Sequence, residues 1–278
     1  MPPLNIPMVH DFAITQRFIM FPDSQIVFRV GYITKRETPL GYDANKTRRF
    51  CLQPRESAVA GGSAGPKPQW FEAPGINCLH YINAWESEGS DDEVVLLASH
   101  ISPVECLSDF PLNSKFSLLE IRFNMREGSV KRRTICSGIN LEFGVFNQAY
   151  IGRKTRYAYY AVRRNRNWLL FTGFVKLDLM HLEEGSGGQE CIVGTREFGE
   201  GKYVGEPWFV EAKGANSEDH GYLLCIVGDN NGGVSELWVL DALSPTLEVV
   251  VVVELPIRVP LGFHGCFINE EQLAQQKA

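Results

Sequence analysis

Short apolar runs separated by turn-forming residues dominate the pattern of this chain. Each run has the length of a strand and is rich in Val, Ile, Leu, Phe or Tyr, as in residues 24–34, 92–102, 115–125, 156–162 and 168–179. Glu127-Gly128-Ser129 and Asn230-Asn231-Gly232-Gly233 lie between such runs and predict tight turns. The pattern therefore predicts an all-β chain built from hairpins.

Two segments depart from the strand pattern. Residues 269–278 (NEEQLAQQKA) predict a short C-terminal helix, and residues 56–70, rich in Gly, Ala and Pro, are typical of a surface loop. No shift in composition divides the chain, which favours one β domain or part of one. Many short strands at fairly even spacing are typical of a sandwich, a barrel or a propeller, and the pattern alone does not choose among them.

The overall composition is that of an ordinary globular protein, with 44% hydrophobic and 22% charged residues. The net charge of −6 argues against nucleic-acid binding, which needs a basic face. Two local basic clusters, Lys131-Arg132-Arg133 and Arg163-Arg164-Asn165-Arg166, are predicted to lie in solvated turns.

The seven cysteines are scattered and include no C-x-x-C pair, which predicts free thiols in a reducing compartment. No apolar run reaches the roughly 18 residues that a membrane-spanning helix needs. The N-terminus has neither signal-peptide nor transit-peptide character.

The six histidines fall into two groups. Partial exposure or one hydrogen bond explains the first three, His100, His181 and His220. The other three lie among aromatic and aliphatic residues where a strand would meet a turn: His10, His80 and His264. A buried imidazole needs a partner, because an unpaired buried polar group costs about 1–3 kcal/mol. Two interpretations stay open: each is a satisfied core histidine, or the three converge on one metal ion.

The segments around these three histidines resemble known motifs. MVHDFAIT, WFEAPGINCLHYINAWE and VPLGFHGCFI are similar to successive iron-histidine motifs of the carotenoid cleavage dioxygenases. NLEFGVFNQAYIGRKTRYAY and GKYVGEPWFVEAKGANSEDHGYLL resemble further signature segments of that family. These motifs follow one another in the family's order over essentially the whole chain. Two of them, EFGVFN and GKYVGEPWFV, look closest to the plant plastid branch called carotenoid cleavage dioxygenase 4.

The resemblance implies a seven-bladed β-propeller with Fe(II) held on its axis by four histidines. His10, His80 and His264 match the family's second, third and fourth ligands. Glu142 matches the glutamate that orients the third histidine, and Glu206 the one that orients the fourth. Such partners are expected, because the outer N–H of a ligating imidazole usually meets a carboxylate.

The match to the family breaks at the N-terminal side. The family's first ligand and the glutamate that supports His10 have no counterpart, since nine residues precede His10. The expectation is that residues 1–278 are the C-terminal portion of a carotenoid oxygenase propeller, a partial propeller of about four blades. Gly144 and His220 are smaller departures from the family pattern.

The predicted function is Fe(II)-dependent oxidative cleavage of conjugated C=C bonds in carotenoids or apocarotenoids, with O2 as co-substrate, by a truncated chain impaired on its own. Phe12, Trp85 and Phe263 are candidates to line the substrate path or to pack beside it. By resemblance the protein belongs in the plastid, and the full-length protein would contact membranes peripherally. The alternative is a non-catalytic fragment that binds carotenoid or partner chains through an open propeller edge.

Overall fold

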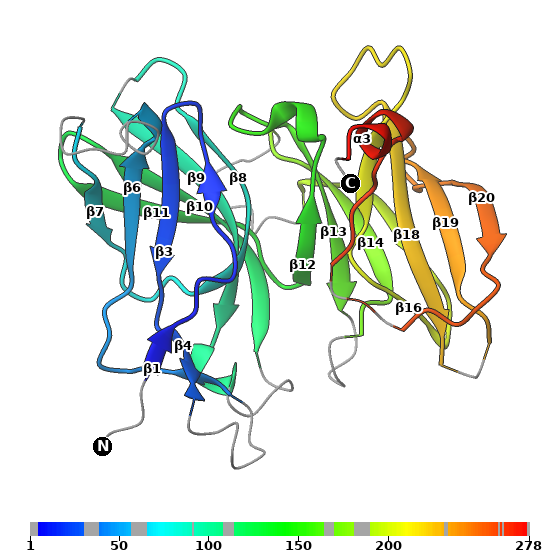
Figure 1. Ribbon diagram of the computed structural model, residues 1–278, viewed down its shortest axis with the longest axis horizontal. Helices are drawn as coiled ribbons and strands as arrows, with labels where there is room; N and C mark the ends of the chain where they lie inside the picture. The colour runs from blue at the N-terminus through cyan, green and yellow to red at the C-terminus, as the bar shows by residue number, and fades with distance from the viewer. Residues whose placement is uncertain are drawn as a thin grey trace.

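The computed structural model describes residues 5–30, 39–56, 66–90, 92–107, 114–163, 170–180, 190–230, 233–260, 262 and 264–276. These residues form a series of antiparallel sheets with one short α-helix near the C-terminus (Figure 1). Four of the sheets are blade-like, and we number them in chain order. A smaller three-stranded sheet lies beside them.

The strands of each blade follow one another along the chain, as the predicted hairpins require. The first blade contains β2 (Ala13–Ile14), β3 (Phe18–Asp23), β6 (Arg49–Pro54) and β7 (Gln69–Glu72). The second contains β8 (Cys78–Glu86), β9 (Glu93–Ser102), β10 (Lys115–Asn124) and β11 (Ser129–Cys136).

The other two blades have the same plan. The third contains β12 (Asn140–Val145), β13 (Tyr157–Arg163), β14 (Gly173–Asp178) and β15 (Ile192–Glu197). The fourth contains β16 (Lys202–Val204), β17 (Trp208–Glu211), β18 (Gly221–Asp229), β19 (Glu236–Asp241) and β20 (Val249–Glu254), with β16 and β17 both paired to β18.

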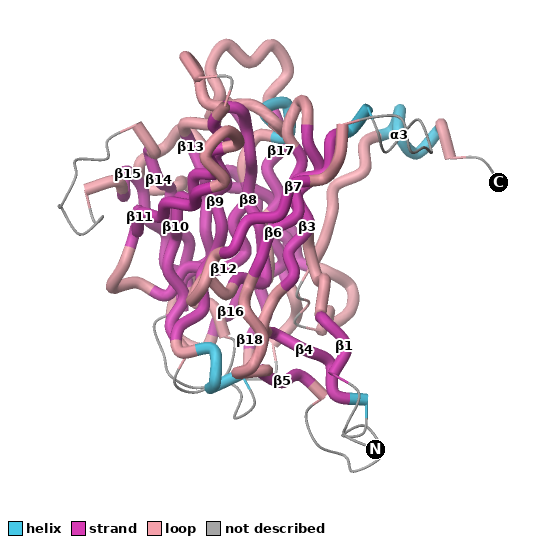
Figure 2. Tube along the Cα trace, turned by 90° about the vertical axis from the view of Figure 1, so that its left-hand side faces the viewer, coloured by secondary structure: helices cyan, strands magenta, loops and turns pink. Residues whose placement is uncertain are grey.

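Several of the described elements lie outside the blades. The small sheet pairs β1 (Asn5–Pro7), β4 (Ile26–Arg29) and β5 (Leu40–Tyr42). Two 3₁₀ turns, Val104–Leu107 and Gln148–Tyr150, interrupt the connections. Helix α3 (Glu270–Ala274) begins with a capping box on Asn269, buries no residue and lies away from the sheets (Figure 2).

The core consists of layers between successive blades. Along β9, Val94, Leu96 and Ala98 pack toward the first blade, whereas Val95 and Leu97 pack toward the third. Alternate side chains of a strand point to opposite faces, so a strand buried on both faces reads as an unbroken apolar run. This explains the apolar run in residues 94–98, and it places the second blade between its neighbours.

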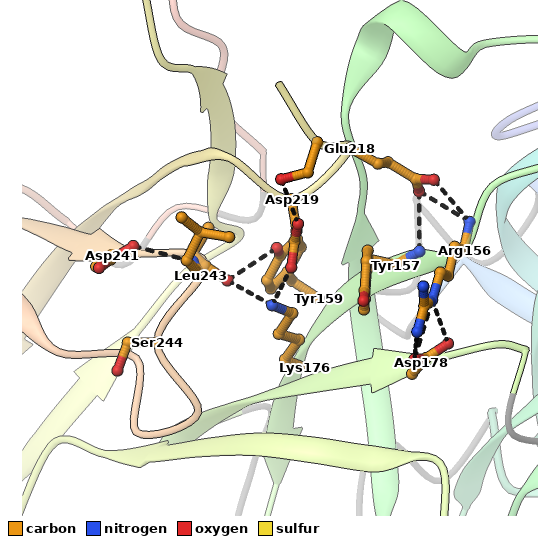
Figure 3. A network of polar contacts seen from close by, with 12 residues as sticks. Arg156, Tyr157, Tyr159, Lys176, Asp178, Glu218, Asp219, Asp241, Leu243 and Ser244 are labelled. Carbon is orange, nitrogen blue, oxygen red and sulfur yellow. Dashed lines mark hydrogen bonds and ion pairs between the residues drawn. The ribbon is translucent and has the colours of Figure 1, made fainter. Parts of the chain in front are cut away.

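A buried polar network joins the third blade to the fourth (Figure 3). Lys176 Nζ lies 2.6 Å from Asp219 Oδ2 and donates to the carbonyl of Ala242 at 2.8 Å. Glu218, in the same loop as Asp219, accepts hydrogen bonds from the backbone N–H groups of Arg156 and Tyr157. The loop between β17 and β18 is therefore tied to β13 and β14.

The all-β class and the short C-terminal helix are confirmed. The predicted turn before β11 is present, with Gly128 at φ 70°. The basic cluster at residues 131–133 was expected in a turn, and this is wrong, because it lies in strand β11. Arg163 is also not solvated: it ends β13 and is 4% exposed.

Two smaller expectations can be compared in part. The loop predicted at residues 56–70 ends earlier, because Gln69 and Trp70 begin β7; residues 57–65 lie outside the described part of the chain. The predicted turn at residues 230–233 includes residues 231 and 232, which lie outside the described part of the chain. No helix within the described ranges has the length and apolarity needed to span a bilayer.

Candidate metal centre

Three histidines from distant parts of the chain meet at one point. His10 precedes β2, His80 lies in β8, and His264 follows β20. One ring nitrogen from each lies within 4.8 Å of the other two, and the Nε2 atoms of His10 and His80 are 3.2 Å apart. Contacts of β2 with β8 and of β8 with β12 bring the first strands of successive blades together here.

Two glutamates hold the outer nitrogens of two of these histidines. Glu142, in β12, places Oε2 at 2.6 Å from His80 Nδ1. Glu206, between β16 and β17, places Oε2 at 3.2 Å from His264 Nδ1. Each bond leaves the Nε2 of its histidine available to a ligand. The structure thus brings together all five residues predicted for the site, while their role in metal binding stays a prediction.

The segment that carries His264 returns from the far edge of the fourth blade. Ser235 anchors it by accepting a hydrogen bond from Val259 N at 2.8 Å. A Cβ built on Gly205 would lie 2.8 Å from the carbonyl of Gly262, so residue 205 must be small for this segment to pass beside Glu206.

Asp11 is a site residue that sequence reasoning missed. Its Oδ2 accepts a hydrogen bond from Tyr81 N at 2.8 Å, and its Oδ1 accepts one from Phe12 N at 2.7 Å. The first bond joins the residue after His10 to the residue after His80. Asp11 could have been recognised from its position next to the predicted ligand His10, because a short carboxylate side chain often bonds nearby backbone N–H groups.

Irregular backbone surrounds His80. The pairing of β8 with β9 shifts register between Cys78 and Tyr81 and again between Tyr81 and Asn83. Such bulges are common next to active sites, because the extra residue re-aims a side chain. Here they explain how His80 leaves the alternating pattern of its strand and reaches His10.

The electrostatics differ between His10 and His80. Partial removal of its ring from water lowers the pKa of His10, and the neighbouring His80 and His264 lower it further. Burial also acts to lower the pKa of His80, but the charge and hydrogen bond of Glu142 outweigh burial and raise it. His80 is therefore held by an anion on one side and faces other imidazoles on the other.

The cluster opens onto a cavity and a groove. The three histidines line a cavity of about 310 Å³ together with Phe143. A groove of about 350 Å³ adjoins it and shares four lining residues with it: Asp11, Tyr81, Gly144 and Glu206. The groove is otherwise mostly apolar, and its apolar residues include Phe12, Ile14, Ile82, Val145, Phe146, Ile151 and Trp208.

The three aromatic candidates have different positions. Phe12 lines the groove and stacks on Phe21 at a centroid distance of 5.7 Å. Trp85 is 7% exposed and packs in the core between the second and third blades. Phe263 lies outside the described residues. Phe12 is thus placed beside the groove, and Trp85 has a packing position.

The remaining histidines that the structure describes have ordinary partners. His100 Nδ1 lies 2.9 Å from the carbonyl oxygen of Asn77, and His220 Nδ1 lies 3.2 Å from Asn216 Oδ1. Neither belongs to the cluster of three. His181 falls outside the described ranges.

The donor set fits a divalent metal ion. Metal–nitrogen bonds of about 2.1 Å keep two ligand nitrogens between about 2.9 Å and about 4.2 Å apart, depending on the angle between them. The 3.2 Å separation of His10 and His80 lies in that range, and the upper limit of 4.8 Å requires only a slight contraction. Imidazole ligands suit iron, zinc and copper, and carboxylates on their outer nitrogens are the usual support.

Comparison with models of known families shows which family the chain belongs to. A family model for RPE65, described as retinal pigment epithelial membrane protein, matches residues 1–269. The chain belongs to this family. Several relatives of the chain are named as dioxygenases that act on carotenoids. A zeaxanthin 7,8(7',8')-cleavage dioxygenase from Crocus sativus is 41% identical over 277 residues, which are 97% of this chain and 70% of the relative.

Other relatives in the RPE65 family are longer than the matched region. A 9-cis-epoxycarotenoid dioxygenase from Oryza sativa is 38% identical, with 96% of this chain and 40% of the relative covered. A probable carotenoid cleavage dioxygenase 4 from Arabidopsis thaliana is 38% identical, with 95% and 43% covered. The chain therefore spans less than half the length of these two relatives, which include the plant branch suggested by the motifs.

Solved structures support the fold. The Synechocystis apocarotenoid oxygenase, in a variant form, superposes with a TM-score of 0.75 at 23% identity, covering 94% of this chain and 53% of the solved chain. The blade-like sheets described above are thus part of the carotenoid oxygenase β-propeller, and they are not closed into a ring.

Proposed function

We propose that this chain carries the metal centre of an enzyme that cleaves conjugated C=C bonds of carotenoids or apocarotenoids with O2, using Fe(II). The observation that carries the proposal is the cluster of His10, His80 and His264, two of them bonded to buried or half-buried glutamates. Membership of the RPE65 family supports the substrate class. The assignment of residues 1–278 to the C-terminal portion of a propeller stays a prediction.

The three histidines would bind the ion through Nε2. Glu142 and Glu206 would keep the protons of His80 and His264 on Nδ1, which leaves the Nε2 lone pairs directed at the ion. Asp11 would fix the loop that carries His10 against β8. When bound, Fe(II) supplies redox chemistry with O2 that side chains lack.

The groove beside the cluster suits a long apolar substrate. Phe146, Ile151 and Trp208 contribute apolar surface to its lining. Burial of a polyene against such surface is favourable at about 25 cal/mol per Å². The groove leads to the histidine cavity through shared walls, so a bound polyene would present one of its double bonds to the metal centre.

Names of relatives support two further parts of the proposal. One solved neighbour is a cobalt-substituted form of the Synechocystis protein, with 22% identity and a TM-score of 0.75, which supports a metal ion in this fold. Several relatives are named chloroplastic or chromoplastic, from which we infer a plastid location. Peripheral membrane contact stays a prediction of the resemblance.

The test compares iron-dependent product formation by the wild type and by His80→Ala. The protein is loaded anaerobically with Fe(II) and given zeaxanthin or an apocarotenal in detergent with O2, and aldehyde or ketone products are measured by mass spectrometry. Products should need both Fe(II) and His80. His220→Ala, which removes a histidine outside the cluster, is the matched control. Products that persist unchanged in His80→Ala contradict the proposal.

A second candidate is carotenoid binding without cleavage. It is favoured by the exposure of two of the three histidines, since the His264 side chain is 44% exposed and His10 is exposed as well. Water at the cluster would compete for ligand positions. A shift in carotenoid absorption on binding, with no product after iron loading, would favour this candidate over the first.

A further inference from the structure

An unusual backbone conformation lies beside the histidine cluster, in β12. Phe143 has φ 53°, in the left-handed region that residues other than glycine rarely adopt. The register of β12 against β13 shifts between Glu142 and Val145, so that Phe143 and Gly144 together oppose Tyr160. Two residues opposing one define a β-bulge.

The bulge lets two consecutive side chains reach the same site. Successive side chains of a regular strand point to opposite faces. Here the Glu142 carboxylate bonds His80, and the ring centroid of the next residue, Phe143, lies 5.7 Å from the centroid of the His80 ring. The same phenyl ring lies 5.6 Å from the His264 ring at an interplanar angle of 81°.

The backbone of Phe143 also fixes the carboxylate. Phe143 N–H donates to Glu142 Oε2 at 2.7 Å, and the same oxygen lies 2.6 Å from His80 Nδ1. Two donors on one oxygen restrict the rotation of the carboxylate. The orientation of His80 therefore depends on the peptide group that joins Glu142 to Phe143 at the start of the bulge.

Packing against a second aromatic ring holds the phenyl ring of Phe143 in place. Phe143 is 4% exposed and packs on Phe171 at a centroid distance of 4.8 Å. The carbonyl of Phe171 accepts a hydrogen bond from Val204 N at 3.0 Å, and Val204 lies two residues before Glu206. A chain of contacts therefore connects Phe143, which lies beside His80, to Glu206, which bonds His264.

We propose that Phe143 is a positioning residue of the metal centre. Its backbone N–H holds the Glu142 carboxylate at His80. Its left-handed conformation turns its own side chain toward the histidines, where the ring fixes the angle between the His80 and His264 rings. The inference rests on the proposed metal site. A phenylalanine with only a packing role would affect stability, whereas a positioning residue also affects metal affinity and ligand geometry.

The experiment titrates Co(II) into the apo forms of the wild type, Phe143→Leu and Phe174→Leu. Phe174 is a matched control, because it is 1% exposed and packs in the same core between the third and fourth blades. Both variants should unfold at lower temperature. Phe143→Leu should bind Co(II) about 10-fold more weakly and change its visible absorption spectrum, while Phe174→Leu should preserve both.

Equal Co(II) affinity and identical spectra in the two variants would overturn the proposal. If Phe143→Leu does not fold, Phe143→Met gives the same comparison with an unbranched side chain. If the wild type binds no Co(II), the metal site itself fails, and a metal-free measurement decides the inference. The downfield proton NMR resonance of His80 Nδ1–H should then be present in the wild type and in Phe174→Leu, and shifted or lost in the Phe143 variant.

Discussion

Glu142 Oε2 lies 2.6 Å from His80 Nδ1, and the Glu142 side chain is 4% exposed. A carboxylate so deeply buried acts on its partner with little screening by water. It raises the pKa of His80 in spite of burial, which works in the opposite direction. The same carboxylate makes the imidazole a better ligand by holding its proton on Nδ1.

Replacing Glu142 with Gln should therefore weaken metal binding by about 10–100-fold, because the shape is kept and the charge is lost. In the metal-free protein the pKa of His80 should fall, since the interaction that raises it is removed. Competition with a chelator and NMR titration of His80 measure the two effects. Glu236→Gln, a carboxylate paired with Lys202 away from the cluster, should change neither.

The ion pair between the third and fourth blades gives a prediction about stability. Lys176 and Asp219 have side chains 5% and 10% exposed. Lys176→Met leaves Asp219 buried and unpaired, which should cost about 3–5 kcal/mol of unfolding free energy. Urea denaturation measures the loss. Lys176→Met combined with Asp219→Leu should recover part of it, because no unpaired charge remains.

An exposed pair provides the comparison for this prediction. Arg126 Nε lies 3.7 Å from Asp92 Oδ2, with side chains 78% and 48% exposed. Arg126→Met should change stability by less than about 0.5 kcal/mol, because water screens the pair. Equal losses from Lys176→Met and Arg126→Met would contradict the assignment of Lys176 and Asp219 as a joint between blades.

His100 gives a prediction about pH. Burial lowers its pKa below the ordinary value of 6.5 and outweighs the hydrogen bond to Asn77. The unfolded chain therefore takes up the proton first as pH falls. The stability that neutral His100 contributes is complete above about pH 6.5 and is lost as pH falls through that value toward the folded pKa.

His100→Gln should flatten this part of the pH dependence, because Gln can bond Asn77 without titrating. Unfolding free energies at about pH 7.5 and about pH 5.5 in the two proteins measure the difference. His220→Gln, which replaces a histidine bonded to Asn216 in a turn, is the control. A wild type and a His100→Gln variant that lose the same stability on acidification would exclude His100 as the cause.

Gly144 gives a steric prediction. A Cβ at this position would lie 2.5 Å from Tyr160 Cε1 and 2.8 Å from Ile82 Cγ1. Gly144→Ala should therefore destabilise the chain by about 1–3 kcal/mol, as overpacking of a filled core does. Gly265→Ala is the control, since a Cβ there would meet nothing within 4 Å. Thermal unfolding compares the two, and equal midpoints would refute the steric argument.

The sequence predicted the parts of the fold that repeat a simple pattern. The apolar run of β9 and the turn at Gly128 follow from periodicity and turn chemistry. Residues 131–133 do not alternate between apolar and polar, so their own sequence does not mark the strand that follows the turn at Gly128. Arg163 was predicted to be solvated because charged side chains are rarely buried, whereas the structure buries it at the end of β13.

The site was predicted through motifs, and its supporting geometry was not. His10 and His80 were predicted by resemblance. Asp11 and Phe143 act through backbone contacts, which cannot be recognised from the residue type alone. A left-handed phenylalanine contradicts local preference, so that sequence rules predict a regular strand at β12. Such departures from local rules concentrate at functional sites, where the surrounding structure maintains them.

The last prediction concerns how firmly these 278 residues hold iron. Three neutral imidazoles place no anion among the direct ligands, and His10 and His264 are exposed to water. Both features should favour exchange of the ion with solvent. We therefore expect the chain expressed alone to lose most Fe(II) on desalting, and cleavage of zeaxanthin to rise with added Fe(II) until it saturates. Near-stoichiometric iron after desalting, with sustained turnover and no added Fe(II), would contradict this and would mean that another residue completes the centre.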